Sequence, residues 1–382
     1  MPASVMEKRG EAAAAPVMGF AFLVQPLPPP LEWDRIIGRL WPALQDVERA
    51  VSRLERDAAG FANPHILLSP IWRREARLSS QIEDTIATPE EIALEQSGLR
   101  ADRDDPREVA NYIVALEHGV RSELPLCVRL LKEMHGKLMA SADPRVRVGE
   151  YRSVQAYIGS AGMGFARARF VPAPPGQPLE DAMRDLERFM NGQHSGPRLP
   201  DLVSVALTHY QFEAIHPFHD GNGRLGRLLI GLSLVRLGVL SQPWMYVSEY
   251  FASHRQEYYD RLLAVSERGE WEAWIGFVSH ALHEQAISTR ARMGLLIDVR
   301  TRLVAMVQQP RDSVLLRNLI EALFDHPILT YSRVEQLCGV SSKGARNLVE
   351  RLVQRGVIEP YAAPGREHRF ICWEVMRATD EG

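Results

Sequence analysis

Apolar residues recur at helical spacing along most of the chain. From Leu31 to about Asp57 they fall every three or four positions with charged residues between them, which predicts an amphipathic helix. The same spacing predicts further helices over the ranges 69–82, 106–121, 125–139, 179–191, 200–215, 223–239, 250–266 and 271–308. The hydrophobic pattern therefore predicts a mainly α protein.

Start signals support two of the N-terminal helices. Ser69-Pro70 offers an N-cap residue followed by Pro at the first helical position, before the helix over 69–82. Thr88-Pro89-Glu90-Glu91 repeats this signal for a short helix. Residues 1–30 are rich in Ala and Pro, and we expect a loosely ordered start that leads into an apolar anchoring segment.

The pattern changes between Tyr151 and Pro175. Two short extended runs, 152–158 and 165–171, flank the Gly-rich stretch 159–164. This arrangement predicts a β-hairpin with a loop longer than two residues.

Gln309-Pro310 breaks the helical pattern, and the hydrophobic pattern of the C-terminal tail, about 312–376, differs from that of the preceding chain. Helices are predicted over 312–324, 331–337 and 341–355, and short strands over 356–359 and 369–372 around the turn at Pro364-Gly365. Three helices and a hairpin are typical of a winged helix-turn-helix. The expected domains are a partly disordered segment 1–30, an N-terminal helical region 31–105, a core 106–310 and a winged-helix domain 311–382.

Composition narrows the class of protein. Hydrophobic residues make up 46% and charged residues 24% of the chain, as in soluble globular proteins. The three cysteines, Cys127, Cys338 and Cys372, are odd in number and far apart, which favours neither a disulfide framework nor a zinc site. A reducing cytoplasm is therefore the expected location. The net charge of −3 gives no overall argument for nucleic acid.

The segment 216–227, HPFHDGNGRLGR, combines several kinds of chemistry. A Gly-rich turn that enters a helix points backbone N–H groups into one anion-binding cup. Arg224 and Arg227 share a helix face beside that cup. Asp220 is a hard oxygen ligand suited to Mg²⁺, and His216 can take a proton near neutral pH. These groups together favour phosphoryl-type transfer.

This segment resembles the Fic-domain signature His-x-Phe-x-Asp/Glu-Gly-Asn-Gly-Arg-x-x-Arg, with every fixed position filled. The resemblance implies a helical Fic core and transfer of AMP from ATP to a hydroxyl side chain of a protein. His216 would deprotonate the hydroxyl, and Asp220 would hold Mg²⁺. The remaining motif residues would bind the nucleotide's phosphates, with Arg227 at the γ-phosphate: Gly221, Asn222, Gly223, Arg224, Gly226 and Arg227.

Two features of the family leave the transferred group and its donor undecided. A subset that phosphorylates its target has Lys in place of the second motif Gly, and Gly223 argues against that subset. Other members transfer different phosphate-linked groups with a similar motif. Enzymes with another nucleotide donor, or acting mainly to remove AMP, are therefore alternatives.

Ser79 and Glu83 are four residues apart and share a helix face. They resemble the family's inhibitory motif Ser/Thr-x-x-x-Glu-Gly/Asn. In that reading Glu83 forms a two-pronged pair with Arg227 and keeps it from the γ-phosphate. Position 84 is Asp where the family usually has Gly or Asn, and a second acid at a helix end is expected to weaken the inhibition. Taken alone, Glu83 would be an ordinary solvated carboxylate.

Two further regions resemble parts of the family's substrate site. The hairpin 151–171 corresponds to the flap, to which a segment of the target protein adds as a strand. Tyr157, Ile158 and Gly159 are the flap residues expected to contact substrate or nucleotide. Tyr258 and Tyr259 are candidates for stacking on adenine, although adjacent helix residues face about 100° apart, so one is expected in the core.

The tail leaves its partner open. The helix over 341–355 carries Lys343, Arg346, Arg351 and Arg355 against Glu350, which suits a recognition helix near phosphates. Over 312–382, however, there are nine Lys and Arg and ten Asp and Glu, so the charge of this segment gives only weak support for DNA binding. DNA binding, protein contacts and homodimerisation all fit such a module. A DNA-binding regulator with a nucleotide-sensing Fic core is the alternative from another class, and self-modification is a further expectation.

Overall fold

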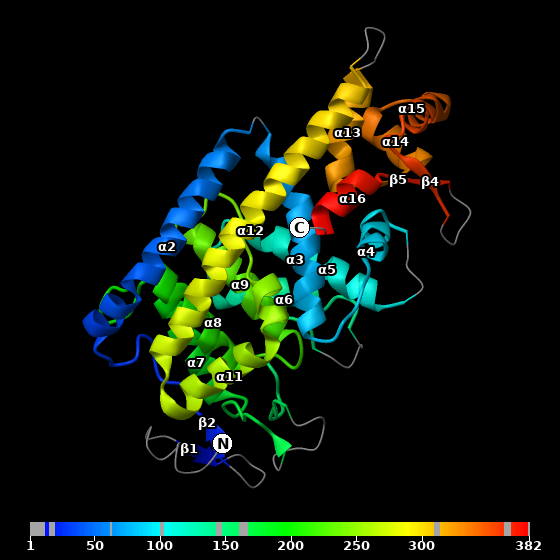
Figure 1. Ribbon diagram of the computed structural model, residues 1–382. Coiled ribbons are helices and arrows are strands. Elements are labelled where there is room, and N and C mark those ends of the chain that lie inside the picture. Colours follow the sequence, from blue (N-terminus) through cyan, green and yellow to red (C-terminus); the bar gives the residue numbers. More distant parts are fainter. Residues whose placement is uncertain are drawn as a thin grey trace. The chain divides into compact units, whose positions relative to one another are not determined.

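A computed structural model describes residues 12–14, 20–61, 63–99, 103–142, 147–159, 167–308, 314–362 and 368–380 (Figure 1). The predicted break at Gln309-Pro310, the turn at Pro364-Gly365 and the Gly-rich tip of the hairpin over 160–166 lie outside these residues. The described chain is mainly helical, as the hydrophobic pattern predicts. Among the described helices none is long and apolar enough to cross a membrane.

The chain folds into two compact units, each assembled from segments that are separated in the sequence. The first unit comprises residues 1–52, 78–84 and 111–286. The second comprises 53–77, 85–110 and 287–382. The sequence-based domain boundaries at 105/106 and 310/311 stay predictions.

The first unit is built around α8 (Asp201–Ile215) and α9 (Asn222–Arg236), which pack side by side (Figure 1). Nearly all residues of both helices are buried, so neither shows the one-sided pattern of a surface helix. The other helices wholly within this unit are α6 (Val128–Leu138), α7 (Gln177–Met190), α10 (Ser248–Ser253) and α11 (Arg255–Arg268).

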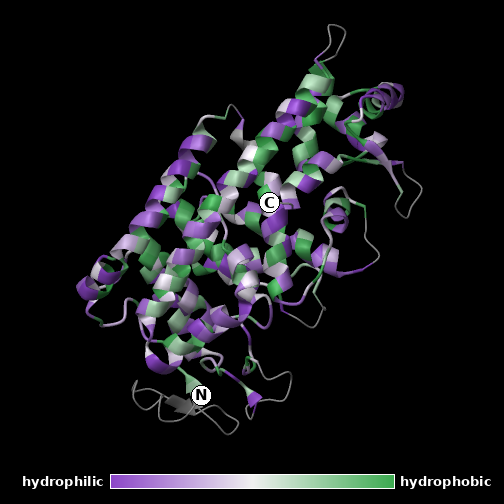
Figure 2. Cartoon of the chain, viewed as in Figure 1, coloured by the Kyte–Doolittle hydropathy of each residue, from purple (hydrophilic) through white to green (hydrophobic). Residues whose placement is uncertain are grey.

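Four helices contribute residues to both units: α2 (Trp33–Ala59), α3 (Leu68–Ile82), α5 (Asp105–Arg121) and α12 (Trp271–Met306). Bands of hydrophilic and hydrophobic residues alternate along α2, as its amphipathic spacing predicts (Figure 2). The last turn of α3, which carries Ser79, belongs to the first unit.

Extended chain near the N-terminus pairs with the flap, residues 151–171. β1 (Ala12–Ala14) and β2 (Phe20–Phe22) form a two-stranded antiparallel sheet. The Phe22 N–H then donates to the Val171 carbonyl at 2.8 Å, which agrees with an anchoring role for this segment. Within the flap, the predicted hairpin is present in the described residues as one antiparallel bridge, between Ile158 and Phe170.

The second unit contains a small sheet framed by helices. Along the chain come η1 (Pro64–Leu67), α4 (Pro89–Gln96), α13 (Val314–Asp325), β3 (Ile328–Thr330), α14 (Tyr331–Cys338), α15 (Ser342–Gln354), β4 (Glu359–Tyr361), β5 (Arg369–Ile371) and α16 (Trp373–Asp380). The sheet is antiparallel with strand order β3-β5-β4. Its buried residues Ile328 and Ile371 pack with Met376 and with Ala93 and Leu94 of α4.

Several predicted boundaries were wrong in detail. The helix over 69–82 begins at Leu68, because the 3₁₀ turn η1 leads straight into it, so Ser69 lies inside the helix. The helix over 250–266 is two helices, divided at His254. There the Ser253 hydroxyl lies 3.0 Å from the carbonyls of Glu249 and Tyr250 and competes with the backbone ladder. β3 and α16 were not predicted, since three- and eight-residue elements carry little periodicity.

Candidate active site

The loop between α8 and α9, residues 216–221, is held in a fixed conformation by its own residues. His216 ends α8 in the left-handed region at φ 51°, and Gly221 precedes α9 at φ 76°. The buried Asn222 side chain closes the loop, since it accepts from the Phe218 N–H at 2.8 Å and donates to the Phe218 carbonyl at 2.9 Å. Any phosphate contact by Asn222 therefore falls to its backbone, because its amide is committed to the loop.

Two residues that the sequence did not single out hold this loop from outside. The Arg152 guanidinium donates to the His216 carbonyl at 2.8 Å and binds the carbonyl of Ala173. His135 accepts from the Gly149 N–H at 2.8 Å, so its other ring nitrogen donates to the Asp220 carbonyl at 3.0 Å. The His135 ring also stacks on Phe218 at 3.9 Å. Neither residue lies within the motif, and only the folded chain brings them to it.

His216 is neutral at physiological pH. Burial, reinforced by the charge of Arg152, lowers the pKa of His216 to about 4, against the opposite effects of Glu83 and Asp220. Its Nδ1 is buried and has no hydrogen-bond partner among the described residues. A neutral imidazole has the protonation state that a general base requires.

Asp220 is the one motif carboxylate and is well exposed, with 64% of its side chain accessible. One oxygen accepts from the Gly221 N–H at 2.6 Å, and the other lies 3.7 Å from Arg224 Nη2. The described residues contain no group of three His, Cys, Asp or Glu side chains placed to hold a metal. A single accessible carboxylate fits Mg²⁺, which proteins bind with one or two carboxylates while phosphates and waters complete its shell.

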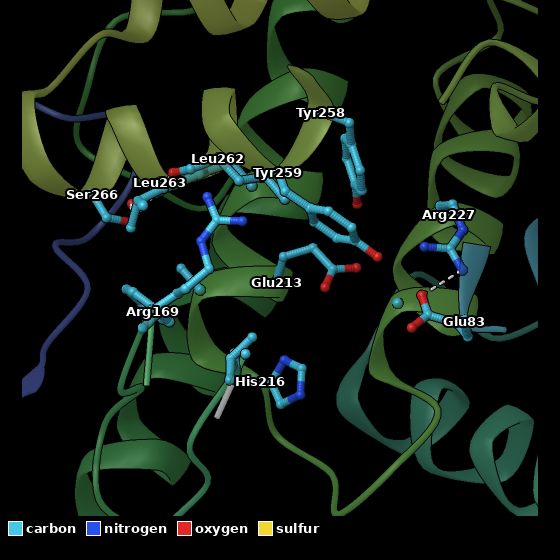
Figure 3. Close-up of a pocket in the computed structure, with 16 residues that line it drawn as sticks. Glu83, Arg169, Glu213, His216, Arg227, Tyr258, Tyr259, Leu262, Leu263 and Ser266 are labelled. Carbon is cyan, nitrogen blue, oxygen red and sulfur yellow. Dashed lines mark hydrogen bonds and ion pairs between the residues drawn. The ribbon is translucent and has the colours of Figure 1, made fainter. Parts of the chain in front are cut away.

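The fully buried Arg227 is held by the end of α3 (Figure 3). Its Nε donates to Ser79 Oγ at 2.9 Å, and its Nη2 donates to the Ser79 carbonyl and to Glu83 Oε1, each at 2.8 Å. The expected two-pronged pair with Glu83 is therefore one hydrogen bond, because Ser79 occupies the second edge of the guanidinium.

Gly223 and Asp84 shape the surroundings of Glu83. A Cβ at Gly223 would lie 2.2 Å from Glu83 Oε1, so the carboxylate rests on bare backbone there. Asp84 adopts φ 63° just after α3 and pairs with Arg255 through both carboxylate oxygens, at 2.8 and 2.9 Å. Arg255 lowers the pKa of Asp84. No pattern in the sequence indicates this partner for the unusual acid, because 171 positions separate the two residues.

Most of the predicted site residues line one cavity of about 350 Å³ (Figure 3). Its wall includes Glu83, Ile158, Gly159, His216, Gly223, Arg227, Tyr258 and Tyr259. The other predicted site residues do not line it: Ser79, Tyr157, Asp220, Gly221, Asn222, Arg224 and Gly226. The wall also includes residues that the sequence analysis missed, of which Glu213 and Arg169 are the charged ones. The volume falls within the range of small-molecule sites.

Tyr258 and Tyr259 differ in burial, as expected for adjacent residues of a helix, which face different directions. Tyr258 is buried, its hydroxyl lies 3.0 Å from His209 Nε2, and its ring stacks on Phe251 at 4.4 Å. His209 Nδ1 in turn lies 2.9 Å from the Gly226 carbonyl, which ties α9 to α11 through α8. Tyr259 is only partly buried and lines the same cavity (Figure 3). Stacking on a base thus suits Tyr259 better than Tyr258.

Family models match the same region. Residues 125–234 match the Fic/DOC family model, and residues 41–121 match the Fic/DOC family N-terminal model. The chain contains a Fic domain. The first match includes His216 and Arg227, and the second includes Glu83.

Curated relatives and solved structures agree with this. "Protein adenylyltransferase Fic" of Drosophila ananassae and of Drosophila melanogaster are each 28% identical over 179 residues, which is 46% of this chain and 32% of each relative. A Fic family protein from Desulfovibrio desulfuricans G20 aligns with TM-score 0.52 and 22% identity over 87% of this chain and 96% of that chain. Fic-1 of C. elegans aligns with TM-score 0.54 and 20% identity over 68% and 76% of the two chains. The structures show the fold, and the chain spans about a third of the Drosophila relatives.

Proposed function

We propose that the protein is an adenylyltransferase that transfers AMP from ATP to a Tyr, Thr or Ser hydroxyl of a protein. The observation that carries the proposal is the cavity that brings a neutral His216 together with Gly223 and the Arg227 guanidinium. The similarity to Drosophila proteins named protein adenylyltransferase supports AMP as the transferred group.

The reaction needs few groups from the protein. His216 takes the proton of the target hydroxyl as its oxygen attacks the α-phosphorus of ATP. The bond from that phosphorus to the oxygen bridging the β-phosphate breaks, and pyrophosphate leaves. Backbone N–H groups at the start of α9 would stabilise the developing charge on the phosphates, and Arg224 is the cation proposed to support them. Mg²⁺ held by Asp220 would neutralise the leaving pyrophosphate.

Glu83 supplies the inhibition in this proposal. Arg227 is the cation that would bind the γ-phosphate, and in the structure Ser79 and Glu83 occupy it. The Glu83 carboxylate also presents negative charge to the cavity that ATP would enter. Removing this side chain frees the guanidinium and the space together. Glu83 also lines the cavity that His216 lines, so removal of AMP by a water molecule that Glu83 positions is the second candidate activity.

The flap is the proposed docking site for the target. Ile158 and Gly159 line the cavity, and the Ile158–Phe170 bridge fixes the flap's edge beside His216. A target segment added along that edge would be held by its main chain, so many sequences would be accepted. A loosely selective edge of this kind also suits self-modification.

We further propose that α13 to β5 form a winged helix-turn-helix. The order helix, strand, helix, helix, strand, strand and the sheet order β3-β5-β4 support this assignment. Its partner stays open between DNA and protein. Arg346 of α15 lies over the Tyr331 ring and Arg355 bonds the Met306 carbonyl, which leaves fewer of its cations for phosphates.

The test is AMP transfer from α-³²P-labelled ATP with Mg²⁺, comparing wild type, Glu83→Gly and Glu83→Gly/His216→Ala. We expect label on protein to rise in the single variant. It should fall by about 10²- to 10⁴-fold in the double variant, the usual contribution of a general base. ATP binding without label in any variant would exclude AMP transfer and favour another donor or a nucleotide sensor.

A further inference from the structure

Glu213 is a carboxyl group that the proposed reaction does not use. It lies on α8 one turn before His216, and its side chain lines the same cavity (Figure 3). Its Oε1 is buried and accepts no hydrogen bond from any residue that the structure describes. A buried carboxyl group without a partner is costly, and a ligand that hydrogen-bonds to it would remove that cost.

The packing around Glu213 fixes where the carboxyl group lies. A Cβ at Gly226 would lie 2.2 Å from Glu213 Oε1, so α9 approaches α8 with no side chain between them at this point. The Arg227 guanidinium is committed to Ser79 and Glu83. Oε1 is thus held against α9 in the wall, and the Glu213 side chain lines the cavity.

Three residues at regular intervals along α8 line the cavity. Tyr210, Glu213 and His216 are three residues apart and all line it, which spaces them by about 4.5 Å each along the helix. In a nucleotide the ribose follows the α-phosphate, and the base follows the ribose. With His216 at the α-phosphate, Glu213 falls at the ribose. The Tyr210 hydroxyl, 2.8 Å from Ser266 Oγ, falls at the base.

We propose that Glu213 binds a ribose hydroxyl of the nucleotide and makes the site selective for ribonucleotides over deoxyribonucleotides. This inference rests on the proposed function, because it takes the α-phosphate to lie at His216. It names a specificity-determining residue that neither the motif nor the inhibitory helix includes.

The charge state of Glu213 agrees with this role. Burial raises the pKa of Glu213 to about 8, while Arg227 acts in the opposite sense. The group is therefore mostly uncharged near pH 7 and does not repel the phosphates. An uncharged carboxyl group can both donate and accept, which matches a hydroxyl group.

The experiment measures nucleotide affinity by calorimetry with Mg²⁺, in a Glu83→Gly background so that Arg227 is free. ATP, 2′-deoxy-ATP and 3′-deoxy-ATP are compared in the background protein and with Glu213→Gln, Glu213→Met or Glu213→Ala added. Glu257→Gln is the matched control, since Glu257 is half-exposed on α11 and pairs with Arg261.

We expect the background protein to prefer ATP over one deoxy analogue by roughly three- to tenfold, the worth of one hydrogen bond. Glu213→Gln and the Glu257→Gln control should keep this preference. Glu213→Met and Glu213→Ala should each abolish it by weakening ATP alone, so either variant that folds is sufficient.

Two outcomes overturn the inference by itself. One is a background protein that binds ATP and both deoxy analogues equally. The other is a Met or Ala variant that weakens all three ligands by the same factor, because Glu213 would then act through Arg227 on the phosphates. If no nucleotide binds the background protein, the proposed function is wrong, and this inference is then wrong as well because it rests on that function.

Discussion

The guanidinium of Arg227 donates to Ser79 Oγ, to the Ser79 carbonyl and to Glu83 Oε1. Only one of these acceptors is a carboxylate, that of the proposed inhibitor Glu83. The buried guanidinium would otherwise lack partners, so Ser79 holds Arg227 in the arrangement that we propose to be inhibited, as Glu83 does.

This division predicts an intermediate phenotype for Ser79→Ala. The variant leaves Arg227 Nε without its hydroxyl acceptor, at a cost of about 1–3 kcal/mol to the inhibited state. AMP transfer should rise above wild type and stay below Glu83→Gly, because the Ser79 carbonyl and Glu83 remain. Ser80→Ala is the matched control, since Ser80 Oγ is buried with no partner among the described residues. Equal rates in the two serine variants would contradict the role of Ser79.

His209 supplies a prediction about pH. Burial and the charge of Arg227 lower the pKa of His209 from 6.5 to about 3. Between these values the unfolded chain binds a proton that the folded chain does not, so this residue costs stability as pH falls below 6.5. His209→Gln preserves an acceptor and a donor for Tyr258 and Gly226. As pH falls from 6 to 4, the unfolding free energy of the variant should decrease less steeply than that of wild type, by about 1.4 kcal/mol per pH unit. Denaturant unfolding at several pH values measures it, and parallel curves for variant and wild type would refute it.

At the scale of elements, the sequence predicted most helices because their periodic patterns are long. It also predicted the cap of α4, where Thr88 and Glu91 form a capping box. It missed the division at His254 and the partners of the motif loop, Arg152 and His135. Those depend on side-chain-to-backbone contacts between distant segments, which no local pattern records.

The end of α3 shows how such contacts change an expectation. From sequence, Asp84 was expected to weaken inhibition as a second acid at a helix end. In the structure it lies beyond α3 in the left-handed region and pairs with Arg255 through both oxygens. The pair satisfies the charge locally, and Glu83 contacts Arg227 independently of it.

Asp84→Gly tests this view of the helix end. Gly suits the left-handed backbone, which stabilises the variant, and the lost exposed ion pair contributes about 1 kcal/mol or less. The two effects on the unfolding free energy therefore nearly cancel. We expect the unfolding free energy to change by less than about 1 kcal/mol and AMP transfer to stay at the wild-type level. A rise in transfer to that of Glu83→Gly would mean that Asp84 itself supports the inhibitor.

At the scale of the whole molecule, the sequence suggested domains that follow one another along the chain. In the fold, α4 and part of α3 belong to the second unit together with the C-terminal segment. Arg73 of α3 is buried and donates to the carbonyls of Phe324 and Asp325, and Arg77 pairs with Asp380 at 2.8 Å. Linear patterns could not show this, because hydrophobic periodicity tells which face is buried and not which segment covers it.

Deleting residues 309–382 distinguishes the two views of this region. A winged-helix domain that follows the core as a separate module would leave the remaining chain as stable as before. In the second unit, the deletion removes Ile328, Ile371 and Met376 from Ala93 and Leu94. It also takes two carbonyl acceptors from the buried Arg73. Exposed apolar surface and a cation that has lost two of its acceptors both destabilise what remains.

We therefore expect the shortened chain to unfold at a lower temperature than the full chain and to bind the dye ANS, which reports exposed apolar surface. A milder variant, Asp380→Asn, removes only the charge that pairs with Arg77 and, at 3.9 Å, with Arg74. It should lower stability by a small amount without dye binding, since the apolar contacts persist. If the shortened chain keeps the full unfolding temperature, α4 and the start of α3 do not depend on the tail for their packing, and the boundary at 310/311 is a true domain boundary.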